Sequence, residues 1–93
     1  MMYRVIPSKK SDAFFKKNPQ WKKKVIEIAK QFIRFLRGQK ENLDIKKLKG
    51  KWEGFYRIKS GKIRILLSID IDADILYIER VGFRGDIRQF KRL

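Results

Sequence analysis

The chain has 93 residues, enough for one domain with a single hydrophobic core, and we expect residues 1–93 to fold as one unit. Its 25 Lys and Arg residues outnumber its 10 Asp and Glu residues, and the net charge of +15 favours a polyanionic or acidic partner. The absence of cysteine and histidine excludes disulfides, thiolate zinc sites and nucleophiles activated by histidine. The apolar runs are too short to span a bilayer and no signal peptide is recognisable, so we expect a cytoplasmic protein without a membrane segment.

The first part of the chain predicts one strand followed by two helices. Residues 3–7 have the pattern of a short strand closed by proline, and Ser8 is a good N-cap for a helix over residues 9–18. Pro19 fits the first turn of a second, longer helix. In that helix, apolar residues recur at a spacing of three and four: Trp21, Val25, Ile28, Ala29, Phe32, Ile33, Phe35 and Leu36. We therefore expect a helical hairpin that covers the core and turns its lysines to solvent.

A polar connection over residues 38–54 leads into a predicted β-hairpin. The stretch GFYRIKSGKIRILL alternates apolar and polar residues around Ser60 and Gly61, and a two-residue loop that contains glycine is a strong hairpin signal. Folding the chain at this loop brings like charges together: Lys59 opposite Lys62, and Arg57 opposite Arg64. Because like charges in directly opposed positions destabilise a sheet, this pairing indicates that an anion binds at these strands.

The end of the chain predicts a turn and a last strand. Asp72 to Asp74 form a three-residue turn, after which residues 75–84 return along the hairpin. The expected pairs are Ile71 with Ile75, Ile65 with Val81, and Arg64 with Gly82. Glu79 then falls among core positions, so we expect a bulge or an exposed edge there. Helices come first and hairpins follow, so we predict an α+β fold in the order β-α-α-β-β-β, with a small antiparallel-rich sheet that includes the first strand.

The same pairing places six cations on the face of the sheet that points away from the helices: Arg57, Lys59, Lys62, Arg64, Arg80 and Arg84. Gly82 leaves space among them. We interpret this face as a cradle for the phosphates of a nucleic acid. A one-residue slip of the last strand would bury Arg80 and Arg84 without partners, which disfavours other registers. The alternative is a set of surface cations that the twist of the sheet spreads apart.

No metal or cofactor site is predicted. Asp70, Asp72 and Asp74 have the spacing that opens a calcium loop. However, the sixth position of that loop is Ile75 rather than glycine, and the twelfth is Val81 rather than glutamate. A glycine-rich phosphate loop followed by Lys and Ser or Thr does not occur either. We therefore expect neither a metal nor a cofactor.

Four short motifs follow one another in a recognisable order: LKG at residues 48–50, YRIK at 56–59, GKIR at 61–64 and VGFR at 81–84. With the strand and two helices before them, they resemble the RelE/ParE superfamily of toxin–antitoxin toxins, most closely the RelE-type ribosome-dependent mRNA endonucleases. The resemblance covers nearly the whole chain. It implies a type II toxin that inhibits translation by cutting mRNA in the ribosomal A site. It also implies two partners, an acidic RelB-like antitoxin and the ribosome with its mRNA.

The resemblance further implies how the cut is made, through attack of a ribose 2′-OH on the adjacent phosphate. It matches four residues to catalytic positions: Lys59 to the proposed general base, Arg57 to a basic position that supports the transition state, Arg64 to the arginine that stabilises the phosphorane, and Arg84 to the proposed general acid. Lys62 and Arg80 are then expected to bind substrate. Phe90 corresponds to the C-terminal tyrosine of the family, so stacking on the substrate is retained and the hydroxyl is lost.

Two other functions are compatible with the sequence. A ParE-like member would inhibit a topoisomerase without cutting nucleic acid, but the presence of all four matched residues argues against this alternative. A basic RNA- or DNA-binding module would need neither catalysis nor an antitoxin. A neighbouring gene for a short acidic protein with an amphipathic helix would separate the toxin from the simple binding module.

Overall fold

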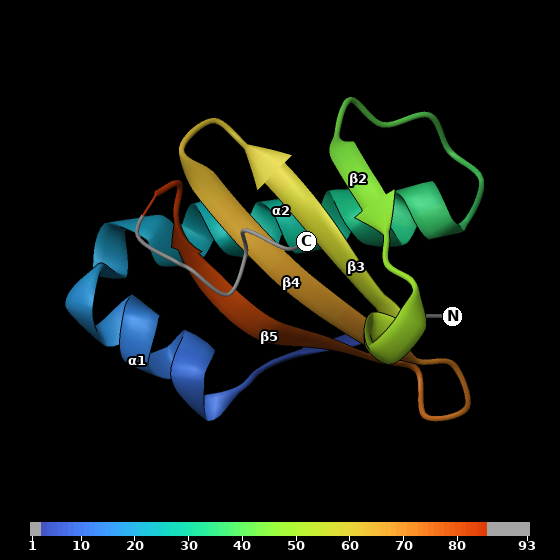
Figure 1. Ribbon diagram of the computed structural model, residues 1–93, viewed down its shortest axis with the longest axis horizontal. Helices are drawn as coiled ribbons and strands as arrows, with labels where there is room; N and C mark the ends of the chain where they lie inside the picture. Colours follow the sequence, from blue (N-terminus) through green and yellow to red (C-terminus); the bar gives the residue numbers. More distant parts are fainter. Residues whose placement is uncertain (1–2, 86–93) are drawn as a thin grey trace.

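The structure, a computed structural model, describes residues 3–85; residues 1–2 and 86–93 lie outside the described part. In chain order, the elements are β1 (Arg4–Pro7), α1 (Lys9–Lys17), the 3₁₀ turn η1 (Pro19–Trp21), α2 (Lys22–Leu36), β2 (Asp44–Lys47), the 3₁₀ turn η2 (Gly50–Trp52), β3 (Phe55–Ser60), β4 (Ile63–Asp70) and β5 (Ile75–Phe83). The predicted α+β class, with an antiparallel-rich sheet packed on two helices, is confirmed (Figure 1).

The five strands form one sheet in the order β1-β5-β4-β3-β2. β1 joins β5 in parallel, and every other neighbouring pair is antiparallel. The long helix α2 runs behind the sheet and α1 lies beside β5 (Figure 1). One face of the sheet is therefore covered by helix, and the opposite face carries four of the six cations that the sequence singled out: Arg57, Lys59, Arg64 and Arg80.

The core lies between α2 and the covered face of the sheet. It contains Phe15 of α1, five residues of α2 and apolar side chains of β3, β4 and β5: Val25, Ile28, Ala29, Phe32, Ile33, Ile58, Ile63, Ile65, Leu67, Leu76, Ile78 and Val81. The predicted spacing of three and four in α2 accounts for its buried stripe. Phe35 is exposed instead, because it lies at the margin of that stripe near the end of the helix. No helix of the described residues is long and apolar enough to cross a membrane.

The start of α1 completes the hydrogen bonding of β5 beyond the end of β1. Ser8 caps the helix by accepting the backbone N–H of Ser11, as predicted for this N-cap. The backbone N–H of Ser8 and the hydroxyl of Ser11 both donate to the carbonyl of Ile78, at 2.9 and 2.7 Å. The Ser8 hydroxyl donates to the carbonyl of Glu79 at 2.7 Å. These bonds hold α1 against β5, and they explain why a serine can be fully buried at position 11.

The first hairpin folds at a different point from the predicted one. Its loop consists of Gly61 and Lys62, so the opposed cations are Lys59 and Arg64 rather than the predicted pairs. The predicted register was wrong by two residues because the turn needs a positive φ at its first central position, and Gly61 has a φ of +56° there. A shift of two residues leaves the side chains within the two strands on their predicted faces, whereas Lys62 moves from the predicted strand into the turn.

The second hairpin contains the predicted bulge. Ile65 pairs with Val81 and Arg64 with Gly82, as expected, but the register changes between Leu66 and Leu67, where Glu79 is the extra residue of β5. The loop accordingly holds four residues instead of three, because Asp70, and not Ile71, pairs with Ile75. The bulge lets Ile78 and Val81 both enter the core while Arg80 stays on the other face.

A strand was missed in the connection between helix and hairpin. β2 pairs with β3 along its full length, with Ile45 opposite Ile58. Its sequence, DIKK, has only one apolar residue, and three of its four residues are exposed. Edge strands with charged side chains avoid pairing with other molecules, and for the same reason they lack the apolar pattern that identifies a strand.

Candidate functional site

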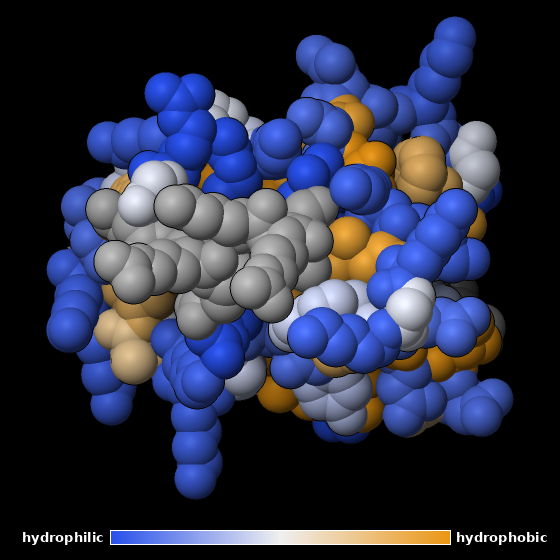
Figure 2. Space-filling view, viewed as in Figure 1, coloured by the Kyte–Doolittle hydropathy of each residue, from blue (hydrophilic) through white to orange (hydrophobic). Residues whose placement is uncertain are grey.

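The register of the strands arranges the uncovered face of the sheet in rows. The first row contains Asp44, Lys59, Arg64 and Gly82, and the second contains Lys46, Arg57, Leu66 and Arg80. Four of the six predicted cradle residues therefore lie in two adjacent rows: Arg57, Lys59, Arg64 and Arg80. Figure 2 shows this side of the molecule, where hydrophilic side chains surround a small apolar area.

Arg57 is a largely buried cation of the second row. Its side chain is 11% exposed, and its Nη2 lies 3.7 Å from Oδ1 of Asp44, whose side chain is 62% exposed. Asp44 stands on β2, directly beside Lys59. The missed strand thus contributes the one carboxylate of the two rows, and this carboxylate pairs with Arg57 and lies next to the proposed base.

Arg64 is held against the turn of its own hairpin. Its Nη1 donates to the carbonyl oxygens of Gly61 and Ile63, at 2.8 and 2.9 Å. A guanidinium has five N–H donors, so the Nε and the Nη2 of Arg64 retain three donors for a ligand. Because the carbonyls already orient the group, Arg64 loses little freedom when it binds an anion.

Lys62 does not join this group. It stands in the turn, and its Nζ lies 5.2 Å from the ring centre of Trp21 and 5.6 Å from that of Phe83. Both rings pack against the main core, so the Lys62 amine points to the helical side in a cation–π contact. The sequence placed Lys62 on the face with Arg57 because it put the hairpin loop one residue too early.

Arg84 and Phe90 complete the predicted set. Arg84 directly follows β5 and is exposed. Its backbone N–H donates to the carbonyl of Lys62, in the turn between β3 and β4, at 2.7 Å. Phe90 lies outside the described residues. The structure thus brings Arg84 to the hairpin turn, near Arg64, whose guanidinium also binds that turn.

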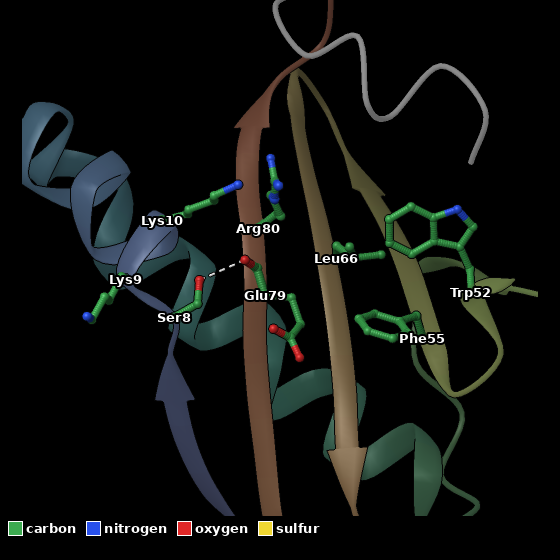
Figure 3. Close-up of a pocket in the computed structure, with 8 residues that line it drawn as sticks. All are labelled: Ser8, Lys9, Lys10, Trp52, Phe55, Leu66, Glu79 and Arg80. Carbon is green, nitrogen blue, oxygen red and sulfur yellow. Dashed lines mark hydrogen bonds between the residues drawn. The ribbon is translucent and has the colours of Figure 1, made fainter.

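The sequence reading missed an apolar cluster on the same face. Leu48 and Leu66 are buried there, and Trp52 and Phe55 pack against them with their ring centres 5.6 Å apart. The cluster borders a pocket of about 360 Å³, which Figure 3 shows between the start of α1, β5, β4 and the turn before β3. The sequence could have indicated this cluster. Phe55 and Leu66 lie at even spacings from the cations of their strands, so they share the cation face and are apolar residues on an otherwise polar face.

The three aspartates of the calcium-like spacing are spread around the second turn. Asp70 accepts the backbone N–H of Ala73 at 3.1 Å and so stabilises the loop. Asp74 has a positive φ of 55°, which aspartate tolerates better than most residues. Over residues 3–85, no group of three or more His, Cys, Asp or Glu side chains is arranged to hold a metal ion.

The fold is similar to that of several solved toxin–antitoxin structures. A chain of the RelB–RelE antitoxin–toxin complex from Methanococcus jannaschii is 26% identical, with 94% of this chain and 99% of that chain covered and a TM-score of 0.66. A chain of the toxin–antitoxin complex RelBE2 from Mycobacterium tuberculosis is 24% identical, with 90% and 100% covered and a TM-score of 0.68. A chain of the archaeal RelE–RelB complex from Pyrococcus horikoshii is 22% identical, with 94% of this chain and 100% of that chain covered and a TM-score of 0.65.

No protein-family model matches the sequence, and no curated protein matches it either. The similarity therefore rests on the arrangement of strands and helices, on coverage that extends over nearly both full chains, and on 26% identity to the Methanococcus jannaschii protein. On this evidence the chain belongs to the RelE-like toxin superfamily.

Proposed function

We propose that this protein is the toxin of a type II toxin–antitoxin pair, and that it is an endoribonuclease that cuts mRNA in the ribosomal A site. The observation that supports this most is the composition of the two rows of the uncovered sheet face. They contain five cations, Lys46, Arg57, Lys59, Arg64 and Arg80, and a single acid, Asp44. Such a face is suited to an RNA backbone and to the negative charge that develops when a phosphate is attacked.

The proposed reaction uses the ribose 2′-OH as nucleophile. Lys59 accepts the 2′-OH proton, the 2′-oxygen bonds to the adjacent phosphorus, and the 5′-oxygen leaves with a proton from Arg84. The products are a 2′,3′-cyclic phosphate and a free 5′-OH. Arg57 and Arg64 stabilise the additional negative charge of the phosphorane. Lys59 and Arg64 are directly opposed across the strands, so both can reach one phosphate.

Mapping of mRNA ends during translation in vitro tests this proposal. With purified protein and ribosomes, we expect new 5′ ends within the codon in the A site, and no cleavage of the same mRNA without ribosomes. Cleavage of free mRNA would show a nuclease that does not depend on the ribosome. If the mRNA stays intact under both conditions, the protein is not a nuclease, and inhibition of a topoisomerase or simple binding of nucleic acid becomes the better explanation.

The proposed partner is an acidic antitoxin. The RelB–RelE complex from Methanococcus jannaschii and the RelBE2 complex from Mycobacterium tuberculosis each pair an antitoxin with a toxin, and the net charge of +15 on this chain favours an acidic partner. An antitoxin segment that is unfolded alone and orders on binding can cover a large part of the surface of such a small protein.

Co-expression tests the antitoxin. We expect the protein alone to arrest growth, and the product of an adjacent gene for a small acidic protein to restore growth and to co-purify with it. Because charge attraction contributes to the complex, the affinity should fall as salt is raised. Growth arrest that no neighbouring acidic protein relieves would contradict the assignment to a toxin–antitoxin pair.

A further inference from the structure

The pocket of about 360 Å³ beside the cation rows has no role in the proposed reaction. Its lining comes from five parts of the chain: the start of α1, the turn before β3, the first residue of β3, β4 and the bulge of β5. Arg80 belongs both to this pocket and to the second cation row, where it is the partner of Leu66. The pocket is therefore continuous with the face that is proposed to bind RNA.

One wall of the pocket is aromatic. The rings of Trp52 and Phe55 meet edge to face, with their planes at 89°, and both stay partly exposed over the buried Leu48 and Leu66. Figure 3 shows the two rings on one side of the pocket and Leu66 between them and β5. Open aromatic faces next to cations are the surfaces on which nucleobases stack.

The opposite wall carries a carboxylate in a fixed position. Glu79 is the extra residue of the bulge, so its side chain is directed to this face together with that of Arg80. The Ser68 hydroxyl donates to its Oε2, and the Ser8 hydroxyl holds its backbone carbonyl. Each carboxylate oxygen accepts about two hydrogen bonds, so Glu79 can still accept N–H donors from a ligand.

The cations of the pocket lie at one end. In Figure 3 the Lys10 amine points toward the Arg80 guanidinium, whereas the amine of Lys9, which also lines the pocket, points away from Arg80. The pocket thus combines an apolar wall, an acceptor for N–H groups and an anion site, a set that fits a nucleotide. An acidic peptide fits less well, because its carboxylates would face that of Glu79.

We propose that this pocket binds the base of a nucleotide next to the phosphate that is cut, and that it prefers bases with an exocyclic amino group. Two residues along a strand span about 7 Å, so the pocket begins about one nucleotide from the row of Lys59 and Arg64. Adenine, cytosine and guanine can donate an amino group to Glu79. Uracil presents carbonyl oxygens on either side of one N–H and is disfavoured there. The assignment of the ligand to RNA rests on the proposed function.

Calorimetric titration of the purified full-length protein with single nucleotides tests the pocket without ribosomes. We expect AMP, CMP and GMP to bind several-fold more tightly than UMP or ribose 5-phosphate. Trp52→Ala should weaken the binding of the three preferred nucleotides by about tenfold or more, because a stacking surface is lost. Trp52→Phe should retain most of their affinity and controls for damage to the fold, together with thermal unfolding of each variant.

Three further variants separate the contributions of base and phosphate. Glu79→Gln should reduce the preference over UMP, because the amide can also donate to a carbonyl of uracil. Lys10→Ala should weaken all five ligands, ribose 5-phosphate included. The matched control Lys23→Ala, which removes an exposed lysine of α2 away from the pocket, should leave them unchanged.

Equal affinities for all five ligands, no detectable binding, or full binding by Trp52→Ala would overturn the proposal. So would an acidic partner whose affinity depends on Trp52 while the nucleotides do not bind, since the pocket would then recognise protein. These outcomes do not depend on cleavage. A wild-type protein that shows the base preference but cuts no mRNA would refute the proposed nuclease function. The assignment of the pocket as a site for a nucleobase would still hold.

Discussion

Replacement of Arg64 by alanine is expected to lower the rate of cleavage of ribosome-bound mRNA by roughly a hundred- to a thousandfold. Arg64 is fixed on the hairpin by hydrogen bonds from Nη1 to two carbonyl oxygens, opposite the proposed base Lys59. A pre-oriented donor that acts on charge in the transition state is worth about 2.7–4 kcal/mol. Binding to the ribosome should fall much less, because Arg57, Lys59 and Arg80 remain on the face.

The measurement is the single-turnover cleavage rate, with ribosome affinity determined in parallel. Arg64→Lys keeps the charge but lacks the planar group, so its rate should lie between those of the wild type and Arg64→Ala. Arg37→Ala, an exposed arginine at the end of α2, removes the same charge elsewhere and should cleave at the wild-type rate. If Arg64→Ala and Arg84→Ala both cleave as fast as the wild type, the proposed active site is wrong.

The largest loss of stability is expected for Phe32→Ala. Phe32 is fully buried and is the largest of the completely buried side chains of the described residues. Its ring packs edge to face on Tyr56 of β3, with ring centres 5.0 Å apart, and so joins α2 to the sheet. Truncation of a buried phenylalanine costs about 3–5 kcal/mol, against a total stability of about 5–15 kcal/mol for a typical domain.

Urea unfolding of a matched pair checks this prediction. Phe35 lies three residues further along the same helix and is 42% exposed, so Phe35→Ala should cost at most about 1 kcal/mol. For Phe32→Ala we expect the urea concentration at the midpoint of unfolding to fall strongly. The slope of the unfolding free energy against urea concentration should stay unchanged, which indicates loss of stability without a change in the unfolded state. Equal losses for the two variants would mean that α2 does not pack on the sheet through this stripe.

The sequence alone determined those features that depend on neighbours along the chain. The spacing of apolar residues in α2 reflects the period of a helix, and the alternation in β3 and β4 reflects that of a strand. Because the strand period is two, Arg57, Lys59 and Arg64 could be assigned to one face even though the predicted hairpin register was wrong by two residues. The N-cap at Ser8 is local in the same sense.

Only the tertiary structure decided the features that depend on distant segments. β2 has no apolar pattern of its own and is a strand because β3 supplies hydrogen bonds along its length. The amine of Lys62 lies over Trp21 and Phe83 because folding brings the aromatic rings to the turn. The pocket at Trp52 and Glu79 unites residues that the chain separates by 27 positions and that only the bulge and the sheet bring to one place. The period of a helix or strand depends on the local backbone conformation and can be read from neighbouring residues. A site depends on which distant segments pair, and that pairing is decided by burial and hydrogen bonding across the whole sheet.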